Sequence, residues 1–141
     1  MLRKTVLLFF SLIFTIHSNA GQRASDAPVI SVRAARVIAF FPPVSQSDLS
    51  NDNDGLNESL NDFQYYAGRV RAPLKKEGID FDEVYAKSFR VRIAAQTSLF
   101  KPSEDRAGYY FIAPGKKPLI EYGVMTDLDI LQIAKEYFRL R

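Results

Sequence analysis

The sequence of 141 residues contains no cysteine and no tryptophan, and it has a single histidine. The absence of cysteine excludes disulfide stapling, thiolate catalysis, thiolate metal sites and lipid attachment at a cysteine. The absence of tryptophan means that the 11 phenylalanines and 7 tyrosines must supply the aromatic rings of any core.

The first twenty residues have the pattern of a cleavable secretory signal peptide. Arg3 and Lys4 form a short positive start, residues 6–16 are mostly apolar, and small residues end the segment at Ala20. An apolar run of about 11 residues is too short for a transmembrane helix, which needs about 20. We therefore expect cleavage before Gly21 and export of the chain, into the periplasm of a Gram-negative bacterium or otherwise as a secreted protein.

Removal of this leader also removes His17, the one histidine. The leader takes two of the 19 basic residues and none of the 16 acidic ones, so 17 basic residues remain and the net charge is about +1. Without histidine, the exported chain has neither a Ser-His-Asp triad nor a histidine-bound zinc. A charge so close to zero gives no support to nucleic-acid binding. We expect no nucleic-acid partner, and no transmembrane segment after signal cleavage.

Behind the leader, the sequence predicts an N-terminal arm over residues 21–35 and one globular domain over residues 36–141. Within the arm, residues 29–32 are expected to form an edge strand. Residues 36–41 are a short run of β-forming apolar residues that ends at two prolines, which indicates a buried central strand. Residues 44–57 are rich in Ser, Asp and Asn and predict a long exposed loop.

Two helices are predicted from apolar spacing. In residues 59–77, Ser59 and Asp62 resemble a capping box, and one apolar face follows with Pro73 as a point where the helix could kink or end. A terminal helix starts at Thr126, with Leu128 in its buried stripe. The residues expected on the buried face of the first helix are Leu60, Phe63, Ala67, Val70 and Leu74.

The remaining strands follow from alternation and turn chemistry. Residues 85–93 alternate as one half-exposed strand, whereas residues 94–107 have no clear period and are interpreted as a connection. Residues 108–113 and 119–124 flank a Pro-Gly-Lys-Lys turn and predict a hairpin. The expected fold class is therefore α+β, with a small mixed sheet of about four strands and two main helices.

This order of elements resembles the thioredoxin-like fold. The resemblance rests on residues 37–41, which run into a loop and a helix, and on residues 109–124, which are followed by a helix as in the last hairpin of that family. Together these stretches cover less than half of the chain. The resemblance implies that the strand over residues 36–41 lies between the strand over 84–93 and the strand over 109–113.

The chain departs from the family at the positions of its chemistry. The polar residues 42–56 stand where the family has Cys-x-x-Cys, and no proline precedes the hairpin at the usual cis position. The second helix of the family is not evident in residues 94–107. A thioredoxin-like fold without these cysteines is redox-inactive, because thiol-disulfide exchange needs an attacking thiolate.

Residues 50–55, Ser-Asn-Asp-Asn-Asp-Gly, offer alternating oxygen ligands to a hard cation. Calcium would be held by Ser50, Asp52 and Asp54. The twelfth position of this loop is Asn61 rather than the bidentate glutamate of an EF-hand, and Asn/Asp loops commonly bind no metal. We favour a solvated loop and expect no cofactor, with calcium as the alternative.

Arginine and tyrosine side chains supply the candidate binding residues. Four arginines would form a patch for carboxylate or phosphate if the first helix packed near the strand over residues 85–93; otherwise they are solvated surface charges. Tyrosines combine a ring with a polar tip and are enriched in recognition surfaces. Of the neighbours Tyr109 and Tyr110, one is expected to be buried and the other available. The candidates are Arg69, Arg71, Arg90, Arg92, Tyr65 and Tyr66.

Two functional classes remain. The favoured one is an exported, non-catalytic binding module for a protein or a small anionic ligand, using residues 44–57 and the neighbouring Tyr and Arg residues. The alternative is an enzyme of the cell envelope that uses carboxylates, which requires a pocket with a desolvated carboxylate pair. The candidate acids and bases are Asp80, Asp82, Glu83 and Glu121.

Overall fold

The structure is a computed structural model that describes residues 27–50 and 54–139. The signal peptide expected over residues 1–20 lies outside these residues, and so do residues 21–26 of the expected N-terminal arm. In chain order the elements are β1 (Val29–Ser31), β2 (Arg36–Phe41), α1 (Gln46–Ser50), α2 (Asp54–Lys76), β3 (Asp80–Tyr85), β4 (Phe89–Ile93), β5 (Gln96–Phe100), the short 3-10 helix η2 (Ser103–Asp105), β6 (Gly108–Ile112), β7 (Leu119–Tyr122) and α3 (Asp127–Phe138).

Within the described residues, the strands form two sheets. The central sheet has four strands in the order β3-β2-β6-β7, and the second sheet has three in the order β1-β4-β5. In the central sheet β2 pairs in parallel with β3 and antiparallel with β6, and β6 pairs antiparallel with β7. The α+β class, with a mixed sheet of four strands and two main helices, is thereby confirmed.

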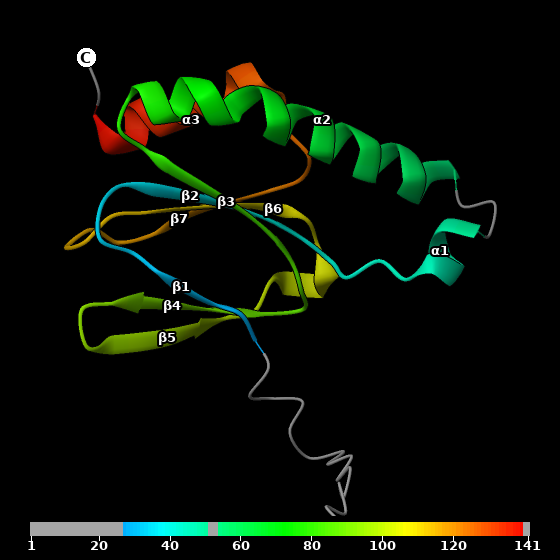
Figure 1. Cartoon of the computed structure of the whole chain (residues 1–141), viewed down its shortest axis with the longest axis horizontal. Helices are drawn as coiled ribbons and strands as arrows, with labels where there is room; N and C mark the ends of the chain where they lie inside the picture. Colours follow the sequence, from blue (N-terminus) through cyan, green and yellow to red (C-terminus); the bar gives the residue numbers. More distant parts are fainter. Residues whose placement is uncertain (1–26, 51–53, 140–141) are drawn as a thin grey trace, which may run out of the picture.

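The elements stack in three layers (Figure 1). Helices α2 and α3 form a helical layer on one face of the central sheet, and the second sheet lies against the opposite face. Each interface contains its own cluster of buried apolar side chains. The central sheet is therefore covered on both faces, and its inner strands β2 and β6 are almost entirely buried.

Strand β2 shows the consequence most clearly. Val37, Ala39 and Phe41 belong to the cluster under the helices, whereas Ile38 and Phe40 belong to the cluster under the second sheet. All five side chains are buried. A strand buried on both faces reads as a continuous apolar run rather than as an alternating one, which is the pattern found in residues 37–41.

The prediction of a single strand over residues 85–93 is wrong. Strand β3 ends at Tyr85 and β4 begins at Phe89, and the two belong to different sheets. The chain crosses the edge of the central sheet between them. Residues 94–107, expected to be a connection, contain β5, which pairs antiparallel with β4. Because β5 is mostly polar and exposed, no apolar period marks it in the sequence.

Helix α2 starts earlier than expected. It begins at Asp54 rather than at residue 59, so the predicted cap at Ser59 is wrong, and α1 occupies part of the stretch expected to be a loop. Its buried face is the expected one, because all five predicted residues are in the core. Contact with the central sheet thus determines the buried face of the helix. Polar residues that are compatible with a helix extend it at its N-terminal end.

Pro73 does not end α2, which continues to Lys76. A proline removes one backbone donor from the helix, but Val70 and Leu74 on either side of it are fully buried and hold the last turns against the sheet. Within residues 27–50 and 54–139, none of the helices combines the length and apolar character that crossing a membrane requires.

The C-terminal hairpin and helix are confirmed. The turn between β6 and β7 contains Gly115 with φ of +75°, a conformation that favours glycine, and Lys116 donates its backbone N–H to Ala113 O at 3.2 Å. Thr126 Oγ1 accepts the N–H of Asp129 at 3.2 Å, which caps α3 as expected. Leu128, however, is 72% exposed, so its predicted place in the buried stripe is wrong.

Tyr109 and Tyr110 point to opposite faces of β6, as expected, but both are buried. Tyr109 lies under the helical layer and Tyr110 under the second sheet. The expectation that one of them would be available for recognition is wrong, because the second sheet covers the face that a two-layer fold would leave open.

Two glycines provide a matched test of the packing between β2, β6 and β7. A Cβ added at Gly108 would clash with Glu121 O and would lie 2.7 Å from Phe40 Cζ, whereas one added at Gly68 in α2 would meet open space. We expect Gly108→Ala to lower the free energy of unfolding by about 1–3 kcal/mol. Gly68→Ala should raise it by about 0.5–1 kcal/mol. Urea denaturation checks both; a Gly108→Ala protein as stable as the wild type would contradict the packing.

Candidate functional site

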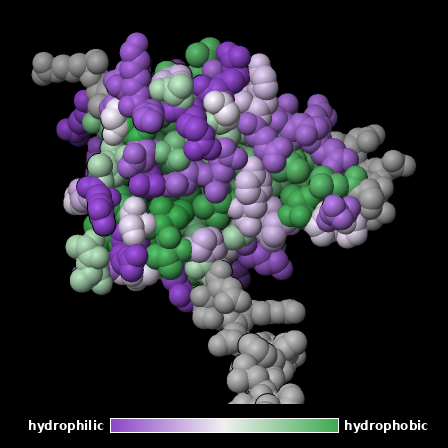
Figure 2. Space-filling view, viewed as in Figure 1, coloured by the Kyte–Doolittle hydropathy of each residue, from purple (hydrophilic) through white to green (hydrophobic). Residues whose placement is uncertain are grey.

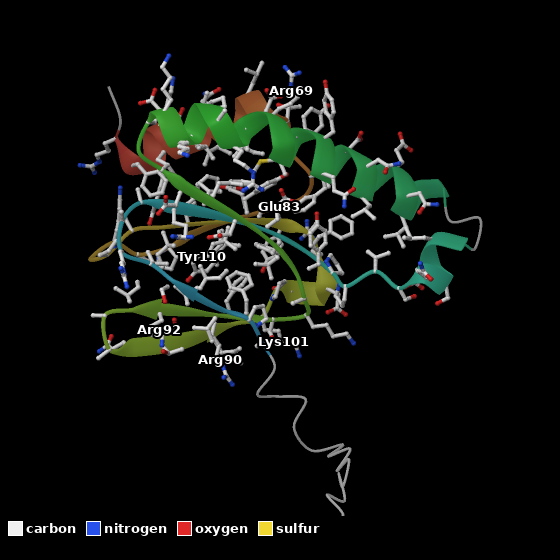
Figure 3. The ribbon with its side chains drawn as sticks, viewed as in Figure 1. Arg69, Glu83, Arg90, Arg92, Lys101 and Tyr110 are labelled. Atoms are coloured by element: carbon white, nitrogen blue, oxygen red, sulfur yellow. The ribbon has the colours of Figure 1, made fainter. Side chains whose placement is uncertain are left out.

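The four predicted arginines do not come together. Arg69 and Arg71 are on α2 in the helical layer, whereas Arg90 and Arg92 are on β4 in the second sheet, across the central sheet from the helices (Figure 3). The expected patch required α2 to pack near β4. In the structure α2 packs on β3 instead, because the strand predicted over residues 85–93 is divided between two sheets.

The arginines of α2 fasten elements to one another. Arg69 Nε donates to Asp127 Oδ2 at 3.3 Å and so links α2 to α3. Arg71 donates to Glu83 Oε1 at 2.6 Å and lies over the Phe81 ring at 5.0 Å, linking α2 to β3. These contacts are on exposed or half-exposed side chains, so each contributes little to stability.

The two predicted tyrosines lie beside Arg69 on α2. The rings of Tyr65 and Tyr66 are 5.2 Å apart between centroids, and Arg69 lies 5.4 Å from the centre of the Tyr65 ring. Tyr65 is 58% exposed and Tyr66 is half-buried. Three of the six predicted binding residues therefore form one group of contacting side chains on α2.

The candidate carboxylates of β3 are engaged by arginine. Arg36 forms ion pairs with Asp82 and, at 3.0 Å, with Asp80. Glu83 accepts hydrogen bonds from Arg71 and, at 2.9 Å, from the Tyr85 hydroxyl. Among the described residues no charged side chain is buried, so the desolvated carboxylate pair required by the enzyme alternative is not found there.

The predicted calcium ligands cannot be placed. Asp52 lies outside the described residues, and so do the side chains of Ser50 and Asp54, which end α1 and begin α2. Within the described part of the chain, no group of His, Asp and Glu residues is arranged to hold a metal ion. The solvated loop expected at residues 50–55 stays a prediction, with calcium binding as its alternative.

A pocket that the sequence did not indicate lies at the carboxyl end of β2. We call it the β2-end pocket; its volume is about 360 Å³. Four segments meet there: the end of β2, the first turns of α2, the segment before β6 and the segment after β7. Its lining residues are Phe41, Pro42, Leu56, Ser59, Asp105, Arg106, Ala107, Gly123 and Val124.

Tyr109 and Gly123 fix the wall of this pocket. The Tyr109 hydroxyl donates to Met125 O at 3.4 Å and accepts from Met125 N at 3.3 Å, so a buried side chain of β6 holds the segment after β7. Gly123 donates its N–H to Ala107 O at 2.8 Å and has φ of +101°, a conformation that favours glycine. The segments before β6 and after β7 are thereby joined at the pocket.

The rim of the pocket contains an unusual turn. Glu104 and Asp105 have φ values of +54° and +51°, although neither is a glycine. Tyr122 holds this turn, because its hydroxyl accepts the N–H of Ser103 at 3.1 Å and its ring lies 4.9 Å from the guanidinium of Arg106. Left-handed non-glycine residues cost about 1–3 kcal/mol and are concentrated at binding sites.

Apolar surface continues from the pocket toward α1. Figure 2 shows hydrophobic residues gathered beside α1, at the N-terminal end of α2. Leu49 on α1 is 43% exposed, and Val44 and Leu56 are half-buried. Exposed apolar residues next to a pocket are a feature of surfaces that bind other molecules.

No family model, curated protein or solved structure matches this chain. The choice of a candidate site therefore depends on the geometry of its residues. Sequence reasoning missed the β2-end pocket because its lining residues come from four segments that carry no shared motif. The one available signal was the pair of prolines after β2, which marks the point where the buried strand must give way to another element.

Burial raises the pKa of the Tyr109 hydroxyl, an effect that its hydrogen bond to Met125 partly offsets. Since the folded-state pKa is above the unfolded value of about 10, the associated stability is present below that pH and is lost as pH rises through the folded-state pKa. We expect the free energy of unfolding to fall above about pH 10, and to fall less steeply in Tyr109→Phe.

Urea denaturation at a series of alkaline pH values measures this slope. The control is Leu128→Ala, which changes an exposed side chain that does not titrate and should leave the slope as in the wild type. Burial also raises the pKa of Tyr110. The free energy of unfolding of Tyr109→Phe should therefore still fall at alkaline pH, but by less than that of the wild type. Identical slopes for Tyr109→Phe and the wild type would contradict the burial of this hydroxyl.

Proposed function

We propose that this chain is an exported, non-catalytic and redox-inactive binding module. It uses the β2-end pocket to hold an apolar segment of a protein partner in the cell envelope. The observation that carries this proposal is the pocket itself, which places apolar side chains from four segments around an opening of about 360 Å³. Arg106 and Asp105 at the rim would orient a partner's polar groups.

The position of the pocket supports a binding role. In sheets with helical crossovers, ligands bind beyond the carboxyl ends of strands, where successive connections leave toward opposite faces. The connection after β2 leads to α2 in the helical layer, and the connection after its parallel neighbour β3 leads to β4 in the second sheet (Figure 1). The two connections thus leave this end of the sheet toward opposite faces.

A thioredoxin-like architecture is part of this proposal. The unit β2-α2-β3 with parallel strands, followed by the β6-β7 hairpin and α3, supports it, as does the place of β2 between β3 and β6. The chain has β4 and β5 where the family has its second helix. With no cysteine in the sequence, the pocket would serve recognition and not thiol exchange.

Capture of a partner from the native envelope tests the proposal. The tagged protein is compared with Val124→Asp, which puts a charge in the pocket, and with Leu128→Asp, which makes the same change at an exposed apolar position on α3. We expect the wild type and Leu128→Asp to capture the same partner and Val124→Asp to lose at least about tenfold, because burying an unpaired carboxylate is costly.

A carboxylate variant distinguishes binding from the enzyme alternative. Asp82→Asn should capture the partner as the wild type does, because Asp82 on β3 does not line the pocket. Equal capture by Val124→Asp and the wild type would contradict a binding role for the β2-end pocket. Loss of capture in Asp82→Asn, with the fold preserved, would favour a site on β3 instead.

A further inference from the structure

The strands of the second sheet carry positive charge without any carboxylate, although Glu104 and Asp105 follow on the connection from β5 to β6. Residues 27–35 and 86–102, which contain β1, β4 and β5, include no aspartate or glutamate. The acidic residues of the described chain lie instead on the helices, on the central sheet and on the segments between them. The basic residues of the second-sheet segments are Arg33, Lys87, Arg90, Arg92 and Lys101.

Strand alternation puts several of these residues on the outer face of the second sheet. The apolar cluster beneath this sheet takes Val91 and Phe89 from β4, so Arg90 and Arg92 point the other way (Figure 3). The register pairs Arg92 with Ser31 on one side and with Thr97 on the other. The outer face therefore presents a hydroxyl on each side of Arg92.

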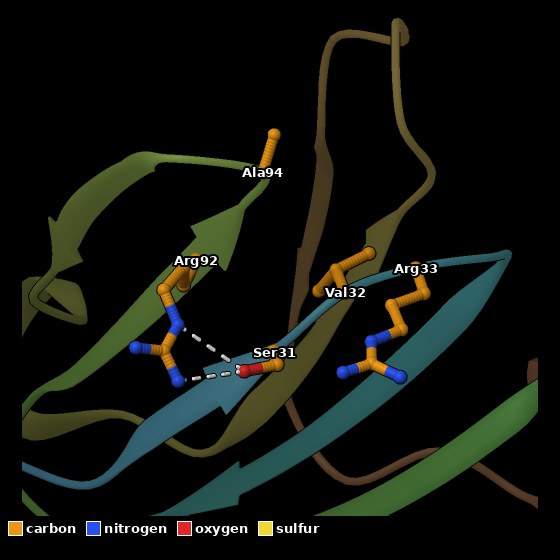
Figure 4. A pocket seen from close by; sticks show the side chains of 5 residues that line it. All are labelled: Ser31, Val32, Arg33, Arg92 and Ala94. Atoms are coloured by element: carbon orange, nitrogen blue, oxygen red, sulfur yellow. Dashed lines mark hydrogen bonds between the residues drawn. The ribbon is translucent and has the colours of Figure 1, made fainter.

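A pocket of about 400 Å³ opens at the end of this face where β1 and β4 finish. We call it the arginine pocket, and Figure 4 shows its lining residues, Ser31, Val32, Arg33, Arg92 and Ala94. It lies at the opposite end of the molecule from the β2-end pocket, next to the connection from β1 to β2 and the turn from β4 to β5 (Figure 1).

One arginine of this pocket is held in position, and the other has no ion pair within residues 27–50 and 54–139. Arg92 donates from Nε and Nη2 to Ser31 Oγ, at 3.3 and 3.1 Å, which fixes its guanidinium over the end of β1. Among the described residues, no carboxylate forms an ion pair with Arg33 or Arg92. The nearby Asp80 and Asp82 of β3 are paired with Arg36.

We infer that the arginine pocket is an oxyanion site for a phosphate group, either inorganic phosphate or a phosphate monoester. Two guanidinium groups that have no carboxylate partner in the described part of the chain create a positive field that an anion relieves, and guanidinium donors match the geometry of phosphate oxygens. Ser31 Oγ already accepts from Arg92, so its own O–H remains to donate to the ligand. The site is independent of the partner proposed for the β2-end pocket.

The arrangement of the donors favours phosphate over a planar carboxylate. The donors come from Arg92 on β4, from Ser31 at the end of β1 and from Arg33 after β1, with Arg92 and Arg33 on either side of Ser31 (Figure 4). A tetrahedral phosphate presents three oxygens to such a set, whereas a carboxylate presents two in one plane. The phosphate is either free in solution or part of a lipid headgroup, and the two arms of the experiment separate these sources.

Isothermal titration with inorganic phosphate, at constant ionic strength set with sodium chloride, tests the free ligand. Sedimentation with phosphatidylcholine vesicles, with or without phosphatidic acid, tests the headgroup. The decisive variant is Arg33→Gln, because Arg33 has no ion pair among the described residues and its loss should leave the fold unchanged. The matched control is Lys101→Gln, which removes one positive charge from the same segments outside the pocket.

We expect Arg33→Gln to weaken phosphate binding about tenfold and Lys101→Gln to change it less than about twofold. Arg92→Lys, which keeps the charge but loses the fork, should also weaken it. Vesicle binding that needs phosphatidic acid and Arg33, without binding of free phosphate, would support the site with a lipid headgroup as its source. Absence of binding in both arms, or equal losses in Arg33→Gln and Lys101→Gln, would overturn it.

Discussion

The structure depends on the burial of β2 on both of its faces. Its side chains alternate between two apolar clusters, one shared with the helices and one shared with the second sheet. At about 25 cal/mol per Å² of apolar surface, burying a side chain such as Phe40 contributes about 2 kcal/mol. A chain without disulfides needs a core of this kind, since no crosslink limits its unfolded state.

The β2-end pocket follows from this arrangement, because a strand buried on both faces is accessible only beyond its ends. The β2-end pocket forms where the chain leaves β2 for α2, and the segments before β6 and after β7 close around it. The arginine pocket forms at the other end, where β1 turns toward β2. The two pockets differ in chemistry: one is lined mainly by apolar groups, and the other by guanidinium and hydroxyl groups.

The sequence was sufficient to predict elements with a strong local signal. The apolar run of β2, the glycine turn between β6 and β7 and the Thr126 cap of α3 each depend on residues that are close in sequence. The division of residues 85–93 between two sheets has no such signal, because Phe89 and Val91 keep the alternation that Tyr85 began. The polar β5 is stabilised by pairing with β4, which is a tertiary effect. The pockets combine segments far apart in sequence, so neither could be found from spacing alone.

Native-state hydrogen exchange measures the stability of β2 directly. If β2 joins both layers, its amides should exchange only when the whole molecule unfolds, with the same free energy as that from urea denaturation. The amides of residues 37–41 are the ones to follow, together with their partners on β6. Exchange of these amides through an opening of clearly lower free energy, while the helices stay protected, would contradict the role of β2 as the common support.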